Sequence, residues 1–195
     1  MILKYKTNFL IAGMLIFLPA SAEALWLHLN EAQRGEAMYY GAKNVNANPK
    51  DFYRDWTIDR GDKGVAILNS EYLTLASAAR DAAESGEEMD ENAIEDALAK
   101  AQGKLVFTVY LYGKDKDFAK NFIAVLKSGG KIFPATYWED GENSLSESHP
   151  GMVVQELFYY FPVGEISLEK TVILEIGDPK QKDKVQFEID LNKLK

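Results

Sequence analysis

The residues that most often carry catalysis are sparse in this 195-residue chain. It contains two histidines, His28 and His149, and no cysteine. A serine triad needs a histidine held by a carboxylate and a nucleophile on a strained turn, but His149 falls in the loop sequence SESHPG and no Gly-x-Ser-x-Gly motif occurs. Zinc needs three or four close nitrogen or sulfur ligands. We therefore expect no catalytic residues, no metal site and no cofactor.

Carboxylates are plentiful, with 30 aspartates and glutamates in the chain. A glycoside hydrolase needs only two of them, but no pair stands out, so a hydrolase stays an alternative. The segment EDGEN at 139–143, together with Asp55, Asp59 and Asp62, supplies the oxygen ligands that calcium prefers. Neither group matches the spacing of an EF-hand loop. We interpret both as solvated loop acids and leave weak calcium binding open.

Aromatic residues are the third group that could do chemistry, by stacking rather than by proton transfer. Rings cluster at Tyr137-Trp138 and at 158–161, in strand-like segments whose alternate side chains point to opposite faces. One set of rings must lie in the core. If the other set lines an open sheet face, it would contact a ligand: Tyr110, Tyr137, Trp138 and Tyr160. We favour the alternative, burial under helices, because soluble monomers seldom expose large apolar patches.

The strands that would position these rings are predicted within residues 104–195. The segment VQFEIDL at 185–191 alternates as a half-buried strand does, whereas KLVFTVYLYG at 104–113 is apolar on both faces and suits a central strand. Ser128-Gly129-Gly130 predicts a hairpin, and Pro134 an edge position, because proline cannot donate to a ladder. Residues 118–126 also suit a helix, but the glycine turn favours a strand. Four further strands are predicted at 121–127, 131–139, 153–161 and 170–176.

The N-terminal part of the domain, 25–103, is predicted to be mainly helical. Asn30–Ala42 has helical character, and Ser70 and Asp90 are residue types that cap helix N-termini. Together these elements predict one α+β domain over residues 25–195. Its C-terminal half is expected to form an antiparallel β-sandwich of immunoglobulin-like architecture, on which two or three helices from the N-terminal half pack.

Residues 1–24 have the pattern of a cleaved secretory signal peptide. Lys4 and Lys6 precede the ten-residue apolar run 9–18, which is shorter than the roughly 20 residues of a membrane-spanning helix. Two small-residue cleavage frames follow, at 20–22 and 22–24, and either could be used. We therefore expect the protein to be released without stable membrane insertion, into a periplasm or outside the cell.

Charge limits the partners that this protein could bind. Removing residues 1–24 leaves 20 basic and 29 acidic residues, a net charge of −9. Nucleic acids and anionic lipids need clustered Lys and Arg, so we expect no nucleic-acid partner. The sequence favours a non-enzymatic envelope protein, an interaction or assembly module whose partner is another exported protein. The alternative is a module that binds a small ligand or carbohydrate on an aromatic sheet face.

Overall fold

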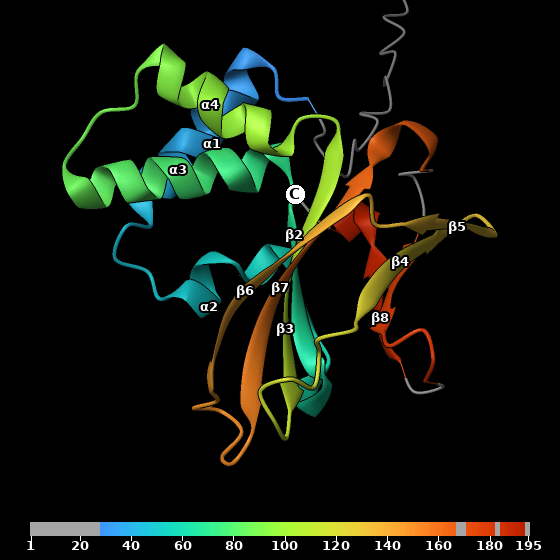
Figure 1. Ribbon diagram of the computed structural model, residues 1–195. Helices are drawn as coiled ribbons and strands as arrows, with labels where there is room; N and C mark the ends of the chain where they lie inside the picture. Colours follow the sequence, from blue (N-terminus) through green and yellow to red (C-terminus); the bar gives the residue numbers. More distant parts are fainter. Residues whose placement is uncertain (1–27, 167–170, 182–183, 194–195) are drawn as a thin grey trace, which may run out of the picture.

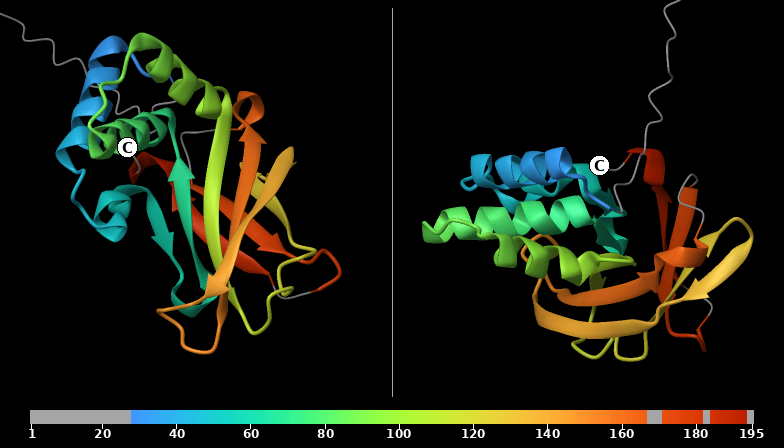
Figure 2. Two further views of the ribbon diagram at one scale, coloured as in Figure 1. Left: turned by 60° about the vertical axis from the view of Figure 1, so that its left-hand side comes forward. Right: turned by 90° about the horizontal axis from the view of Figure 1, so that it is seen from above.

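The computed structural model describes residues 28–166, 171–181 and 184–193. In this part of the chain the fold is α+β, with nine strands in two antiparallel sheets and a layer of helices. Figure 1 shows the helices gathered at one end of the larger sheet, and the right-hand view of Figure 2 shows them on the side away from the smaller sheet. The predicted signal peptide, 1–24, lies outside the described residues.

The larger sheet has five strands in the order β1-β2-β3-β7-β6, all antiparallel to their neighbours. The predicted central strand at 104–113 is confirmed as β3, which lies in the middle of this sheet between β2 and β7. The strands are β1 (Thr57–Asp59), β2 (Gly64–Asn69), β3 (Lys104–Gly113), β6 (Tyr137–Leu145) and β7 (Val153–Pro162).

The smaller sheet has four strands in the order β5-β4-β8-β9. Gly129 and Gly130 form the predicted β4–β5 hairpin turn with positive φ angles of 57° and 79°, which glycine adopts without steric cost. Pro134 ends edge strand β5, as predicted. The strands are β4 (Ile123–Ser128), β5 (Lys131–Pro134), β8 (Thr171–Gly177) and β9 (Val185–Asp190).

The inner faces of the two sheets form the main hydrophobic core. Period-two alternation places Phe107 of β3 and Tyr159 of β7 on the inner face of the larger sheet, and Phe187 of β9 on that of the smaller sheet. All three side chains are fully buried. This apolar contact orients the larger sheet, so its opposite face is directed toward the helices and solvent.

The predicted strand 131–139 is wrong in extent, because the chain changes sheets within it. The backbone N–H of Ala135 donates to Ala124 in the smaller sheet at 3.1 Å, and that of Thr136 donates to Tyr160 in the larger sheet at 2.9 Å. Pro134 cannot extend the β5 ladder, which favours the break at this point. The prediction of an acidic loop at 139–143 is also wrong, because these residues belong to β6.

Three of the helices begin where the capping residues predict, whereas the four-residue helix α2 was not predicted. Asn30, Ser70 and Asp90 each accept a hydrogen bond from a backbone N–H in the first turn of their helix, and Gly86 ends α3 in the left-handed conformation. The helices are α1 (Glu31–Lys43), α2 (Pro49–Phe52), α3 (Glu71–Ser85) and α4 (Glu91–Ala101).

A second core joins these helices to one another. Phe52, Trp56 and Tyr72 are buried around Tyr40, and the rings of Trp56 and Tyr72 stack at 5.8 Å. Helices α1 and α3 approach so closely at Gly41 that an added Cβ would lie 2.1 Å from a backbone oxygen of α3. This close packing holds the helices together as one layer. Two of its members, α3 and α4, border the outer face of the larger sheet.

Two strands come from the N-terminal stretch, where the sequence indicated helices and extended connections. Strand β1 is only three residues long, and β2, Gly64–Asn69, runs directly into the N-cap of α3. Neither strand was predicted. Because both belong to the larger sheet, this sheet draws on both halves of the chain. In the ambiguous segment 118–126, regular strand begins only at Ile123.

Candidate functional site

The outer face of the larger sheet combines exposed rings with carboxylates. Because residues two apart share a face, β3, β6 and β7 direct one set of side chains away from the sandwich core. We call this set the aromatic–acidic face: Tyr110, Tyr137, Glu139, Glu156, Phe158 and Tyr160. It contains three of the four predicted ligand-contact residues.

Strand register brings these side chains together across the sheet. Tyr160 of β7 lies opposite Tyr137 of edge strand β6, and their ring centroids are 5.3 Å apart. Tyr110 of β3 lies opposite Glu156 of β7. Tyr110 and Tyr160 are half-buried, whereas Tyr137 is 53% exposed. The predicted aromatic platform therefore has its open side at the β6 edge.

Two tyrosine hydroxyls orient the carboxylates of this face. Tyr110 Oη donates to Glu156 Oε1 at 2.7 Å, and Tyr137 Oη donates to Glu139 Oε1 at the same distance. Burial, and then the hydrogen bond to Glu156, raises the pKa of Tyr110; the bond to Glu139 raises the pKa of Tyr137. Both tyrosines thus remain neutral donors at physiological pH. Neither glutamate forms an ion pair with a Lys or Arg in the described part of the chain.

Trp138 does not share a surface with the other predicted contact residues. It lies opposite Tyr159, whose side chain is in the sandwich core, so Trp138 projects from the inner side of β6. At the sheet edge it remains 51% exposed. The expectation that Tyr137 and Trp138 line one face is wrong, because consecutive strand residues point to opposite faces.

A hollow of about 340 Å³ adjoins the aromatic–acidic face where the sheet meets α3 and α4. Phe158 and Tyr160 belong to both. The sheet contributes Asn69, whose amide donates to Thr108 Oγ1 at 2.9 Å. Asp81 of α3 and Lys100 of α4 bring opposite charges to the same hollow, and both are exposed. Its other lining residues are Tyr53, Thr74, Ser77, Ala78, Ala97, Ala101 and Val106.

The edge of the face is β6, a nine-residue strand that is exposed at every position except Gly141. Its pairing with β7 shifts between Asp140 and Asn143, a bulge that interrupts the regular ladder. Glu139, Asp140 and Glu142 give the strand three carboxylates, and it contains no Lys or Arg.

The histidines are far apart in sequence and contact different residues. His149 lies beside the outer face of the larger sheet, because Tyr112, on which it packs, shares that face of β3 with Tyr110. His149 Nδ1 lies 2.9 Å from Ser148 Oγ in the β6–β7 loop, and its ring packs on Tyr112 at 4.1 Å. His28 Nδ1 lies 3.2 Å from Glu71 Oε1 at the start of α3. Within the described ranges, no group of three or more His, Asp or Glu side chains is placed to hold a metal ion. Asp55, Asp59 and Asp62 form no such group.

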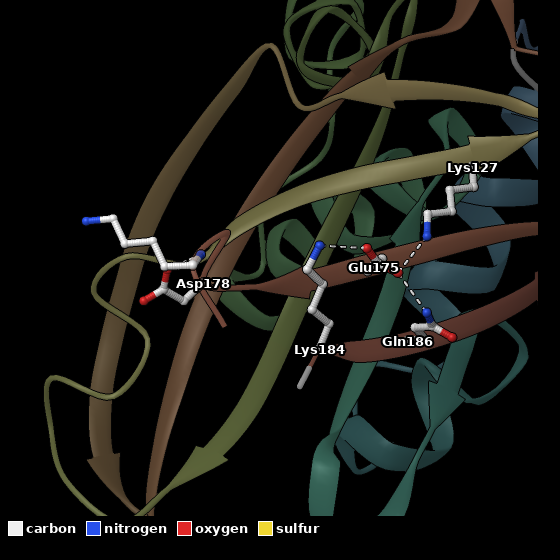
Figure 3. A network of polar contacts seen from close by, with 6 residues as sticks. Lys127, Glu175, Asp178, Lys184 and Gln186 are labelled. Carbon is white, nitrogen blue, oxygen red and sulfur yellow. Dashed lines mark hydrogen bonds and ion pairs between the residues drawn. The ribbon is translucent and has the colours of Figure 1, made fainter. Parts of the chain in front are cut away.

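The outer face of the smaller sheet is built differently (Figure 3). Its central carboxylate, Glu175 of β8, is buried and accepts from Lys127 Nζ at 2.6 Å, Lys184 Nζ at 3.0 Å and Gln186 Nε2 at 2.7 Å. These hydrogen bonds, the one from Lys127 first, lower the pKa of Glu175 to about 2. Asp178 lies to one side and is not joined to the network (Figure 3).

Sequence reasoning missed Glu156 of the aromatic–acidic face and considered Glu139 only as a possible calcium ligand in a loop. The segment VVQELFYYF contains the signal that would have found Glu156, because period two places it with Phe158 and Tyr160. The hollow had no such signal, since its lining comes from separate helices and strands that only the folded chain brings together.

None of the helices within the described ranges is long and apolar enough to cross a membrane. No protein-family model matches the chain, and no curated protein matches it in sequence. A crystal structure of a protein of unknown function from Burkholderia pseudomallei is similar over 84% of this chain and 91% of that chain, with 12% sequence identity and a TM-score of 0.44.

Proposed function

We propose that this protein is an exported, non-enzymatic envelope protein, an interaction or assembly module with an immunoglobulin-like sandwich as its scaffold. Its partner is another exported protein, which binds at the aromatic–acidic face and the adjoining β6 edge. The compartment is the periplasm or the exterior of the cell. The signal-peptide pattern at residues 1–24 supports export.

The observation that carries this proposal is the exposure of large rings at one sheet edge. Tyr137 and Trp138 are about half exposed on opposite sides of β6. Aromatic residues are enriched in the buried centres of protein interfaces, because one ring covers much area at a small entropic cost. Neighbouring Glu139 and Glu156 lack cationic partners among the described residues, so they offer charge to an incoming molecule.

Site-specific photo-crosslinking in the native cells tests the proposal. A photoreactive amino acid replaces Tyr137 in one variant and Ile132 in a matched variant. Ile132 is 63% exposed on the outer side of β5 in the other sheet, so it controls for exposure alone. We expect the position-137 variant to capture one reproducible envelope protein and the position-132 variant to capture none. Equal capture at both positions would contradict the proposal.

Mass spectrometry of the same purified protein tests export. Cleavage in either predicted frame gives a chain that begins at Glu23 or Leu25. A chain that retains Met1 would contradict the export part of the proposal and leave the surface proposal to the crosslinking result.

The hollow favours a second candidate function, binding of a small ligand or carbohydrate. Phe158 and Tyr160 offer ring surfaces beside the Asn69 amide and several hydroxyl groups, a combination suited to a polar ligand with an apolar face. Tyr160→Ala should then abolish ligand-induced thermal stabilisation, while Tyr112→Ala, outside the hollow, should preserve it. An unchanged response of Tyr160→Ala to a sugar panel would remove this candidate.

A further inference from the structure

We propose that the partner presents an extended, basic segment, which adds to the larger sheet beside β6 as a sixth strand. This inference rests on the proposed function and names the partner's chemistry. It is carried by the topology, the charge and the side-chain directions of β6.

Strand β6 is the longest edge in the described part of either sheet. It has nine residues, against three for β1, four for β5 and six for β9. An edge strand presents unpaired backbone N–H and C=O groups on its free side, and an extended peptide can satisfy them by pairing. Strand β5 is short and carries Pro134, so it is a much poorer template.

The charge of β6 selects the partner. Its carboxylates, Glu139, Asp140 and Glu142, would lie opposite one another if two copies of this edge paired, and like charges directly opposite destabilise a strand pair. Self-association through β6 is therefore disfavoured. A strand with Lys or Arg at the facing positions would instead form favourable cross-strand pairs.

Both sides of β6 can take part in this recognition. Tyr137 and Glu139 project on the outer side, while Trp138 and Asp140 project on the inner side. Each side therefore pairs one exposed ring with one carboxylate. A ring face attracts a cation electrostatically, and a neighbouring carboxylate adds a direct ion pair. The incoming segment can place basic side chains on either side.

A buried hydroxyl lies beneath the same edge. Tyr159 Oη is inaccessible and has no hydrogen-bond partner within the described residues. Tyr159 is opposite Trp138 in the strand register, and the charge of Asp140 contributes to raising its pKa after burial itself. Tyr159 thus lies on the inner face of β7, next to the part of β6 where Asp140 is proposed to bind a basic side chain of the partner.

The bulge sets the extent of pairing. Regular register with β7 runs from Tyr137 to Asp140 and is then interrupted before Asn143. A bulge interrupts a regular ladder without ending the strand. The added strand is therefore expected to pair with two short stretches of β6, Tyr137–Asp140, where the rings and two carboxylates lie, and Asn143–Leu145 beyond the bulge.

A synthetic peptide that alternates lysine with valine is the probe, and its glutamate–valine counterpart is the control peptide. Hydrogen–deuterium exchange is measured on the purified mature protein with each peptide. We expect the lysine peptide to slow exchange of the β6 amides and to leave those of β5 unchanged, and we expect the glutamate peptide to do neither. Slower exchange elsewhere, with β6 unaffected, would overturn the inference.

A second test of the inference uses variants that change the charge of β6. Glu139→Lys/Asp140→Lys should weaken binding of the lysine peptide by about tenfold or more, and Glu139→Gln/Asp140→Asn should weaken it less. Glu188→Lys, on the outer side of β9 in the other sheet, is the matched control and should bind normally. Thermal melting verifies that each variant folds. Equal affinity of the wild type and the double lysine variant would overturn the inference.

The two proposals can fail separately. If position 137 captures an envelope protein in cells but the lysine peptide does not protect β6, the partner lacks a basic strand and only this inference is wrong. If position 137 also captures nothing, the proposed function falls with it.

Discussion

The outer faces of the two sheets use carboxylates in opposite ways. On the smaller sheet, Glu175 is buried under Lys127 and Lys184, so its charge is satisfied within the molecule. On the larger sheet, Glu139 and Glu156 accept hydrogen bonds from neutral tyrosine hydroxyls and form no ion pair with a Lys or Arg among the described residues. A satisfied charge stabilises the fold and offers little to a partner, whereas a carboxylate without a cation retains its capacity to bind one.

The largest difference between the faces should appear in stability. Glu175→Ala leaves the two lysines facing each other without a counter-charge, and we expect the free energy of unfolding to fall by about 2 kcal/mol, less than for a fully buried pair because water reaches this face. Glu156→Ala removes one hydrogen bond and should cost about 1 kcal/mol. Urea denaturation measures both. An equal or larger cost for Glu156→Ala would break the comparison.

The pH dependence of stability should follow Glu175. Its pKa is lowered in the folded state from 4.5 to about 2, so its contribution is fully present above about pH 4.5 and is lost as the pH falls toward 2. We expect a loss of about 1 kcal/mol over this window, after allowance for solvent screening. Glu175→Gln should remove this part of the acid dependence. An unchanged acid profile in that variant would contradict the ion-pair account.

Tyr110 should matter moderately to the fold. Tyr110→Phe removes the hydroxyl that donates to Glu156 but keeps the ring, so we expect a loss of up to about 1 kcal/mol in thermal or urea unfolding. A change beyond about 2 kcal/mol would show that the aromatic–acidic face is built mainly for stability and would weaken the contrast with the other sheet.

The smallest effect on stability is expected at the exposed edge. Tyr137→Phe and Glu139→Gln should each change the free energy of unfolding by less than about 0.5 kcal/mol, because both side chains are exposed. In cells, Glu139→Gln should reduce the amount of partner that the crosslinker at position 137 recovers. If this variant lost stability but recovered the partner normally, the β6 edge would serve the fold rather than partner binding.

Local patterns predicted the elements that depend on local physics. Ser70, Gly86 and Asp90 marked helix ends correctly because capping is a property of adjacent residues. Strand β3 was recognisable as central because both of its faces are apolar. In the ambiguous segment 118–126, the glycine turn correctly favoured a strand from Ile123 on, whereas residues 118–122 form turns.

Features that depend on tertiary context were missed. The sheet change at Ala135 is fixed by hydrogen bonds to two different sheets, and three-residue β1 is held mainly by its pairing with β2. At the site, aromatic content drew attention to Tyr110, Tyr137 and Tyr160, which the structure places on one sheet face. It also grouped Trp138 with them against strict alternation. Glu156 was overlooked because only rings were considered on that strand, and Glu139 was assigned to a loop rather than to the sheet face.

The central claim is that the β6 edge of the larger sheet is the surface that a partner covers. The most direct test is hydrogen–deuterium exchange on the protein purified together with the partner captured at position 137, compared with the protein alone. The account predicts slower exchange in Tyr137–Leu145 and unchanged exchange in Lys131–Pro134. Protection of Lys131–Pro134, with Tyr137–Leu145 as fast as in the free protein, would contradict it.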